Sequence, residues 1–171
     1  EMVVRGWYCL GPLLRTRQPS LRYLACNVYG PAAVSGNLVL FEAGLIPDAV
    51  ASVTAVTPKR SRSLKTPYGN IHWLTVPRSS VFIGTYAVKD PPGYIRATTE
   101  KALLDQLYII RYTPQSYSLW QAFILEDLRI DKDALESLDL TSMYELGRTY
   151  KSPKIIKHIK WFQKYLGIPN K

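Results

Sequence analysis

Four cationic side chains lie within seven residues in the segment Lys59-Arg-Ser-Arg-Ser-Leu-Lys65. Guanidinium and ammonium groups at this density bind phosphate oxygens, and arginine can do so with two parallel hydrogen bonds. The serines of the segment can add hydrogen bonds to the same oxygens. The predicted nucleic-acid or partner contacts here are Lys59, Arg60, Arg62 and Lys65. An acidic protein face would suit the same charges, and a flexible loop kept soluble by them is the alternative.

A second basic group lies near the C-terminus, where Ile155, Ile159, Phe162 and Leu166 recur at helical spacing and predict one buried face. Three lysines fall on the opposite face without acidic partners four residues away, and they are further predicted contacts for nucleic acid or a partner: Lys157, Lys160 and Lys164. Lysine also commonly fills a solvent-facing helix, so a purely structural role is the alternative. Trp161 can stack on a base or pack on the core.

The charges are segregated along the chain, whose net charge is +9. Residues 49–89 hold six basic side chains and no acidic one, and residues 148–171 hold seven and no acidic one. Between residues 126 and 145 the sign reverses, with seven acids against two bases. This pattern indicates a two-faced surface with one side suited to a polyanion.

Carboxylates near a lysine could also serve a nuclease or nucleotidyltransferase, which makes Glu100, Lys101 and Asp105 the enzymatic candidates. Glu100 lies at a predicted helix start, where the helix dipole favours it, and Lys101 and Asp105 form an i,i+4 pair typical of a helix surface. His72 and His158 have no Cys, Asp or Glu at ligand spacing. We therefore expect no catalytic residue, no metal ion and no cofactor, and predict that the chain is not an enzyme.

The segment Ile95–Tyr108 predicts a short strand end followed by an amphipathic helix. Thr98 or Thr99 can cap the helix, and the apolar residues from Leu103 to Tyr108 fall on one face. Together with Val56-Thr-Pro-Lys-Arg60 and Tyr68-Gly69, this segment resembles the C-terminal domain of AbiEi-type antitoxins of type IV toxin–antitoxin systems. The resemblance spans roughly residues 28–108, and its structural motif residues are Thr99, Glu100, Lys101, Leu104 and Asp105.

The resemblance implies an antitoxin domain that opposes a nucleotidyltransferase toxin and, with a winged-helix domain, represses its own operon. Its partners would be DNA of its own promoter or RNA, with the toxin as functional partner. Masking of the toxin and competition at a shared RNA both remain open. The alternative is a C-terminal oligomerisation or ligand-sensing domain of a general transcriptional regulator. Residues 3–10 resemble the wing strand of such a winged helix, so we expect the chain to be a fragment that lacks the upstream helices.

The remaining patterns predict an α+β fold, a small mixed or antiparallel sheet with packed helices followed by a helical C-terminal part. Predicted strands cover residues 50–57, 71–76, 82–88 and 94–97, with 58–67 as a loop or hairpin connection. Predicted helices begin near Leu21, at Gly30-Pro31, after Ser118, after Asp131 or Asp133, after Thr141 and at Ser152-Pro153, the last ended by Gly167 and Pro169. The predicted domains are 1–27 (wing end and linker), 28–112 (core) and 113–171 (helical extension).

Cys9 and Cys26 have no CxxC spacing, and we expect two reduced thiols of a cytoplasmic protein. The chain has no run of eighteen apolar residues, so we expect no membrane span and no membrane partner.

Overall fold

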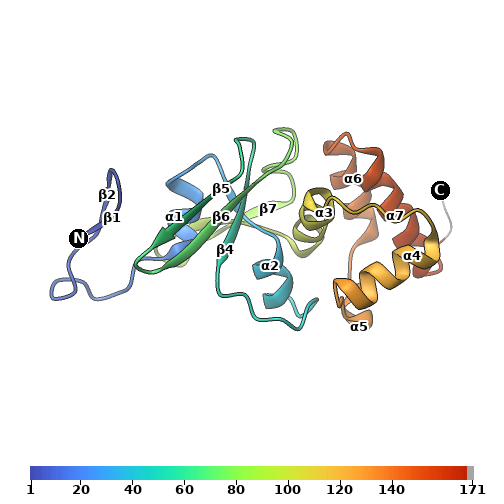
Figure 1. Cartoon of the computed structure of the whole chain (residues 1–171), viewed down its shortest axis with the longest axis horizontal. Helices are drawn as coiled ribbons and strands as arrows, with labels where there is room; N and C mark the ends of the chain where they lie inside the picture. Colours follow the sequence, from blue (N-terminus) through green and yellow to red (C-terminus); the bar gives the residue numbers. More distant parts are fainter. Residues whose placement is uncertain (169–171) are drawn as a thin grey trace.

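The computed structural model of the chain describes residues 1–168. It confirms the predicted α+β class, with helices, a six-stranded mixed sheet and a separate small hairpin. Figure 1 shows an elongated molecule, with the hairpin at the N-terminal end, the sheet in the middle and a group of helices at the other end. Pro169, predicted to follow the last helix, lies outside the described residues.

The N-terminal residues form an antiparallel hairpin of β1 (Met2–Val4) and β2 (Trp7–Tyr8). The prediction of one strand over residues 3–10 is therefore wrong. Gly6 adopts φ +83°, a left-handed conformation that glycine tolerates, and the chain reverses there.

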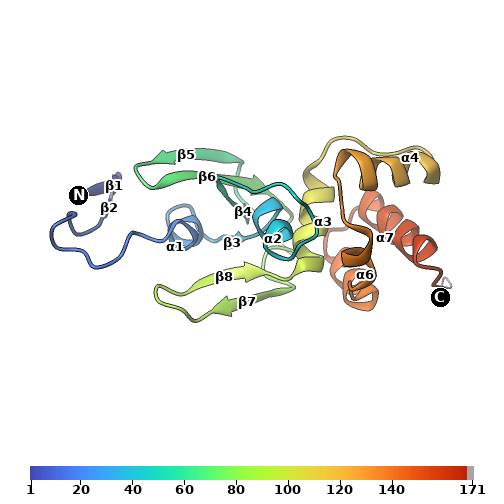
Figure 2. The same ribbon diagram turned by 90° about the horizontal axis from the view of Figure 1, so that it is seen from below.

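Helix α1 (Leu21–Asn27) begins where the sequence predicts a helix, because Ser20 Oγ accepts a hydrogen bond from Tyr23 N at 3.3 Å. The helix packs on the central strands of the sheet, and Trp73 Nε1 donates to its Ala25 carbonyl at 2.7 Å. Figure 2 shows α1 lying between the two outer hairpins of the sheet. Leu24 and Ala25 of α1 belong to the hydrophobic core, although the predicted domains place residues 1–27 in the wing end and linker.

The sheet has the order β5-β6-β4-β3-β8-β7, with antiparallel hairpins at both edges and parallel pairs β6–β4 and β3–β8. Its strands are β3 (Ala33–Val34), β4 (Val53–Thr57), β5 (Arg62–Thr66), β6 (Gly69–Thr75), β7 (Thr85–Val88) and β8 (Tyr94–Ala97). The last of these matches its prediction residue for residue. Strand β5 corrects the prediction of a loop or hairpin connection over residues 58–67, because its polar residues form a strand only by pairing with β6.

The predicted helix that begins at Gly30-Pro31 is also wrong. Its first part is the two-residue strand β3, held in the sheet centre by β4 and β8, and only α2 (Asn37–Glu42) is helical. Gly36 lies between them with φ +69° and separates strand from helix. Of the four apolar residues at helical spacing in this segment, Val34, Leu38 and Leu45 are buried but Phe41 is 37% exposed. The spacing therefore marks burial at three of its four positions and does not give the secondary structure.

Helix α3 (Thr99–Ile109) is capped by Thr98, whose hydroxyl accepts a hydrogen bond from Lys101 N at 3.3 Å. Leu103, Leu104 and Leu107 are fully buried, as the helical spacing predicts. The helix contacts β8 and α2 on one side and the C-terminal helices on the other, so it joins the sheet to the helical part.

The C-terminal part contains α4 (Tyr117–Ala122), a π-helical turn (Phe123–Asp127), α5 (Lys132–Glu136), α6 (Leu140–Thr149) and α7 (Pro153–Tyr165). Ser116 caps α4 and Asp139 caps α6, which corrects the predicted caps Ser118 and Thr141. Asp131 caps α5, one of its two predicted alternatives. Within residues 1–168, no helix combines the length and apolar character that a membrane crossing requires.

Candidate nucleic-acid interface

The basic hairpin, defined as Lys59, Arg60, Arg62 and Lys65, occupies the β4–β5 connection and β5. All four side chains are exposed. Strand β5 is an edge of the sheet, and among the described residues it pairs with β6 alone. Charged residues on an edge strand prevent pairing with other chains, so they have a structural use besides any ligand.

One aromatic ring organises half of the basic hairpin. Lys59 Nζ lies 5.0 Å and Arg62 Cζ 5.5 Å from the centroid of the Tyr29 ring, which packs edge-on against Trp73. Cations held over an aromatic face lose less conformational freedom when they bind an anion. The side chains of Arg60 and Lys65 have no hydrogen-bond, ion-pair or aromatic partner within residues 1–168 and are free to approach phosphates.

A groove of about 460 Å³ adjoins the basic hairpin. Its polar lining includes Asn37, Thr54, Ser61, Ser63, His72 and Gln106. Ser63 Oγ lies 2.8 Å from His72 Nδ1, and Ser61 Oγ lies 3.0 Å from Thr75 Oγ1. The serines predicted to contact phosphate are thus already engaged across the hairpin, although a hydroxyl retains further hydrogen-bonding capacity.

The predicted lysines of α7 are mostly engaged within the protein. Lys157 Nζ donates to the Pro114 carbonyl at 3.1 Å and lies 4.6 Å from the Trp161 ring centroid. Lys164 Nζ lies 4.2 Å from the ring centroid of Tyr117. The absence of acidic partners on α7 is therefore explained in part by carbonyl and aromatic partners from the α3–α4 connection and α4. Among the described residues, Lys160 alone of the three has no such partner.

Trp161 packs on the core side, with its ring centroid 5.9 Å from that of Trp120. The buried His158 accepts a hydrogen bond at Nδ1 from Trp120 Nε1 at 3.0 Å. Burial, together with nearby Lys154 and Lys157, lowers the pKa of His158 to about 4, so this imidazole is neutral at pH 7.

The two predicted basic groups do not meet in space. Figure 1 shows β5 on the sheet and α7 in the helical part, with α3 between them. The basic hairpin is therefore the better site, because its four cations are all exposed and clustered, whereas Lys157 of α7 is half-buried and bonded to the Pro114 carbonyl.

The motif residues Lys101 and Asp105 form their predicted i,i+4 pair, but the prediction that this pair lies on a helix surface is wrong. Their side chains are 1% and 0% exposed. Lys101 Nζ is bonded to Asp105 and donates to Tyr150 Oη at 2.9 Å. Asp105 also accepts hydrogen bonds from Ser35 Oγ and Tyr150 Oη, each at 2.6 Å. This network joins α3 to the β3–α2 junction and to the end of α6.

The buried network shifts the pKa values of two of its members. Burial lowers the pKa of Lys101 although Asp105 opposes this, and burial with the Asp105 charge raises the pKa of Tyr150. Ser35 and Tyr150 were not predicted as members, since neither lies at a helical spacing from Asp105. Leu104 is fully buried, and Glu100 Oε1 accepts a hydrogen bond from Asp139 N at 3.3 Å. Thr99 is the first residue of α3. The geometry gives these motif residues structural contacts.

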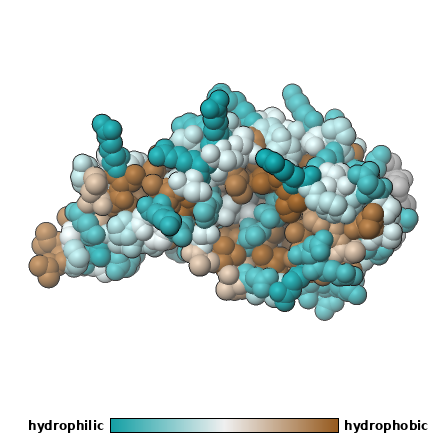
Figure 3. Space-filling view, in the orientation of Figure 1, coloured by the Kyte–Doolittle hydropathy of each residue, from teal (hydrophilic) through white to brown (hydrophobic). Residues whose placement is uncertain are grey.

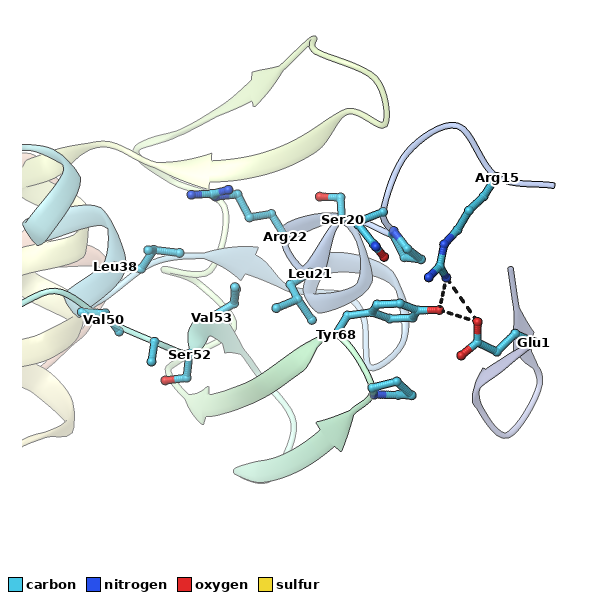
Figure 4. Close-up of a pocket in the computed structure, with 14 residues that line it drawn as sticks. Glu1, Arg15, Ser20, Leu21, Arg22, Leu38, Val50, Ser52, Val53 and Tyr68 are labelled. Atoms are coloured by element: carbon cyan, nitrogen blue, oxygen red, sulfur yellow. Dashed lines mark hydrogen bonds and ion pairs between the residues drawn. The ribbon is translucent and has the colours of Figure 1, made fainter. Parts of the chain in front are cut away.

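The Tyr68-Gly69 motif anchors the N-terminal segment (Figure 4). Tyr68 Oη accepts a hydrogen bond from Arg15 Nη1 at 2.6 Å and donates to Glu1 Oε2 at 3.0 Å. The hydrogen bond with Cys9 and partial desolvation raise the pKa of Tyr68 to about 12. The adjoining groove of about 770 Å³ is open and lined by residues of α1, β4 and this turn.

Within residues 1–168, no group of His, Cys, Asp and Glu side chains is arranged to hold a metal ion. Both cysteines are free thiols. Cys26 Sγ donates to the Ile95 carbonyl at 3.4 Å.

Comparison with known proteins leaves the family open. No protein-family model matches the chain, and no curated protein matches it.

Proposed function

We propose that this chain is the antitoxin domain of a type IV toxin–antitoxin system, cytoplasmic and without catalytic activity of its own. It opposes a nucleotidyltransferase toxin and, with a winged-helix domain, represses its own operon. In this proposal the basic hairpin is the contact for nucleic acid, either promoter DNA or an RNA. The observation that carries it is the set of four exposed cations on one edge of the sheet.

Three features support this proposal. The basic hairpin lies in a stretch of 41 residues, 49–89, without a carboxylate, so no acid from that stretch neutralises it. Tyr29 orients two of its cations, which favours a defined contact over a loosely charged loop. The hairpin β1–β2 has the two-stranded form of a wing.

Growth rescue tests the proposal. The chain is co-expressed with the nucleotidyltransferase encoded beside it, and growth is compared with that of cells producing the nucleotidyltransferase alone. We expect rescue by the unaltered chain and loss of rescue in Arg60→Glu/Lys65→Glu. The matched control is Lys89→Glu/Lys132→Glu, which makes the same charge change at exposed sites outside the basic hairpin. Absence of a neighbouring nucleotidyltransferase, or no rescue by the unaltered chain, would contradict the antitoxin function.

The second candidate, an oligomerisation domain of a transcriptional regulator, is favoured by exposed apolar residues at the N-terminal end of the molecule. Equal rescue by the hairpin variant and by its control would leave the antitoxin function intact. It would mean that the basic hairpin is not needed for that function.

A further inference from the structure

The segment after β2 exposes large apolar side chains to an unusual degree. Leu13 is 99% exposed, Leu14 74% and Leu10 61%. Figure 3 shows hydrophobic side chains, in brown, at the left end of the molecule, which is the N-terminal end in the same orientation in Figure 1. Arg17, close by in the sequence, is exposed and has no ion-pair partner among residues 1–168. The segment 10–17, here called the leucine segment, thus combines leucines with a free cation.

The opposite end of the molecule carries a groove of about 1010 Å³ between α5, α6 and the end of α7. Its apolar lining is formed by Leu138, Leu140, Tyr144, Leu166 and Ile168. A groove of this kind, called here the α6–α7 groove, accepts apolar side chains because they lose their contact with water there.

Carboxylates border the α6–α7 groove. Glu136, Asp139 and Glu145 line it, and none of them has an ion-pair partner within the described part of the chain. Hydrogen bonds from Ser142 and Thr141 lower the pKa of Asp139, so it stays ionised at neutral pH. The rim is therefore negative where the leucine segment is positive.

From this complementarity we propose that the leucine segment of one copy of the chain binds in the α6–α7 groove of a second copy. Leu13 and Leu14 enter the groove, and Arg17 meets the carboxylates at its rim. Figure 1 shows the segment before α1 at one end of the molecule and the helices α5, α6 and α7, which carry the groove, at the other. One chain therefore cannot join the two within itself. The contact is head to tail, and each added copy presents a new free end.

The size of the contact sets its strength. An eight-residue segment buries less surface than the ~1,200 Å² of a stable interface, so the association is weak and concentration-dependent. Sedimentation velocity from about 10 µM to 1 mM covers dissociation constants of this order. We expect the average mass of the unaltered chain to rise continuously over this range.

Two double variants each disrupt one of the two contacting surfaces. Leu13→Asp/Leu14→Asp alters the leucine segment, and Glu136→Lys/Glu145→Lys alters the groove. Each is expected to raise the dissociation constant at least tenfold. The matched controls change other exposed groups of the same kind. They are Phe82→Asp/Ile83→Asp and Glu126→Lys/Asp133→Lys, and both should associate like the unaltered chain.

Mixing the two end variants gives the decisive result. Each retains one intact end, so an equimolar mixture should form a one-to-one heterodimer and nothing larger, while each variant alone stays monomeric. The heterodimer also shows that both variants are folded.

Four results would overturn the proposal: an unaltered chain that is monomeric at 1 mM, controls that dissociate as much as the variants, a mixture without a heterodimer, or loss of association in the leucine variant while the groove variant still associates like the unaltered chain. The last would mean that the leucine segment binds some other surface. The measurement needs no toxin or nucleic acid, so its failure is distinct from failure of the proposed function.

Discussion

Loss of either partner of the buried pair Lys101 and Asp105 should strongly destabilise this fold. Removing one partner of a buried ion pair leaves an uncompensated charge and destabilises a protein by about 3–5 kcal/mol. Lys101→Met leaves Asp105 with two neutral hydroxyl donors, and Asp105→Asn leaves the ammonium of Lys101 with one hydroxyl. We therefore expect each single variant to lose about 3–5 kcal/mol of unfolding free energy in urea denaturation.

The double variant Lys101→Met/Asp105→Asn removes both charges, so its loss should fall at least about 2 kcal/mol short of the sum of the single losses. The exposed pair of Arg129 and Asp48, whose side chains are 58% and 68% exposed, is the matched control. Its cycle of Arg129→Met and Asp48→Asn should give a coupling below about 1 kcal/mol. Equal coupling energies in the two cycles would refute the assignment of the buried pair as a structural link between sheet and helices.

Two further predictions concern single positions. Since His158 has a pKa of about 4 when folded against an ordinary 6.5, the unfolded chain binds more protons between these values. His158 should therefore contribute about 3 kcal/mol of stability that is full above pH 6.5 and lost as the pH falls to 4. Urea unfolding at pH 7 and pH 4 should show this loss in the unaltered chain and not in His158→Gln; equal losses would contradict it. Gly69 has φ +132°, and an added Cβ would lie 2.7 Å from Leu21 Cδ1, so Gly69→Ala should cost about 1–3 kcal/mol. Gly11→Ala, where nothing lies within 4 Å, should stay within about 0.5 kcal/mol in the same measurement, and equal effects would count against this account of Gly69.

Local patterns in the sequence predict those helices and strands that are determined by residues close to them in the chain. The cap at Thr98, the buried face of α3 and the strand Tyr94–Ala97 follow from neighbouring residues and agree with the structure. Strand β3 could not be predicted in this way, because its two residues become a strand only through β4 and β8. Likewise, the polar strand β5 depends on β6.

The candidate site was predicted in part. The exposed cations of the basic hairpin are as expected from their density in the sequence, whereas the ring that orients two of them, Tyr29, is 30 residues before Lys59 and gives no local signal. The engagement of Lys157 by the Pro114 carbonyl depends on how α7 packs, which spacing along the helix does not specify. Burial of Lys101 and Asp105 follows from partners 49 and 70 residues away, Tyr150 and Ser35.

The salt dependence of nucleic-acid binding tests the central claim most directly. Fluorescence anisotropy would follow binding of a labelled promoter duplex and a labelled RNA strand between about 50 and 200 mM salt. In a plot of the logarithm of the binding constant against the logarithm of the salt concentration, each phosphate contact steepens the slope by about 0.9 on duplex DNA and about 0.7 on a single strand. For Arg60→Glu/Lys65→Glu the slope should be shallower by about 1.8 on duplex DNA or about 1.4 on single-stranded RNA, and Lys89→Glu/Lys132→Glu should leave it unchanged. An unchanged slope in the hairpin variant, or an equal decrease in the control, would contradict the assignment of the basic hairpin as the nucleic-acid contact.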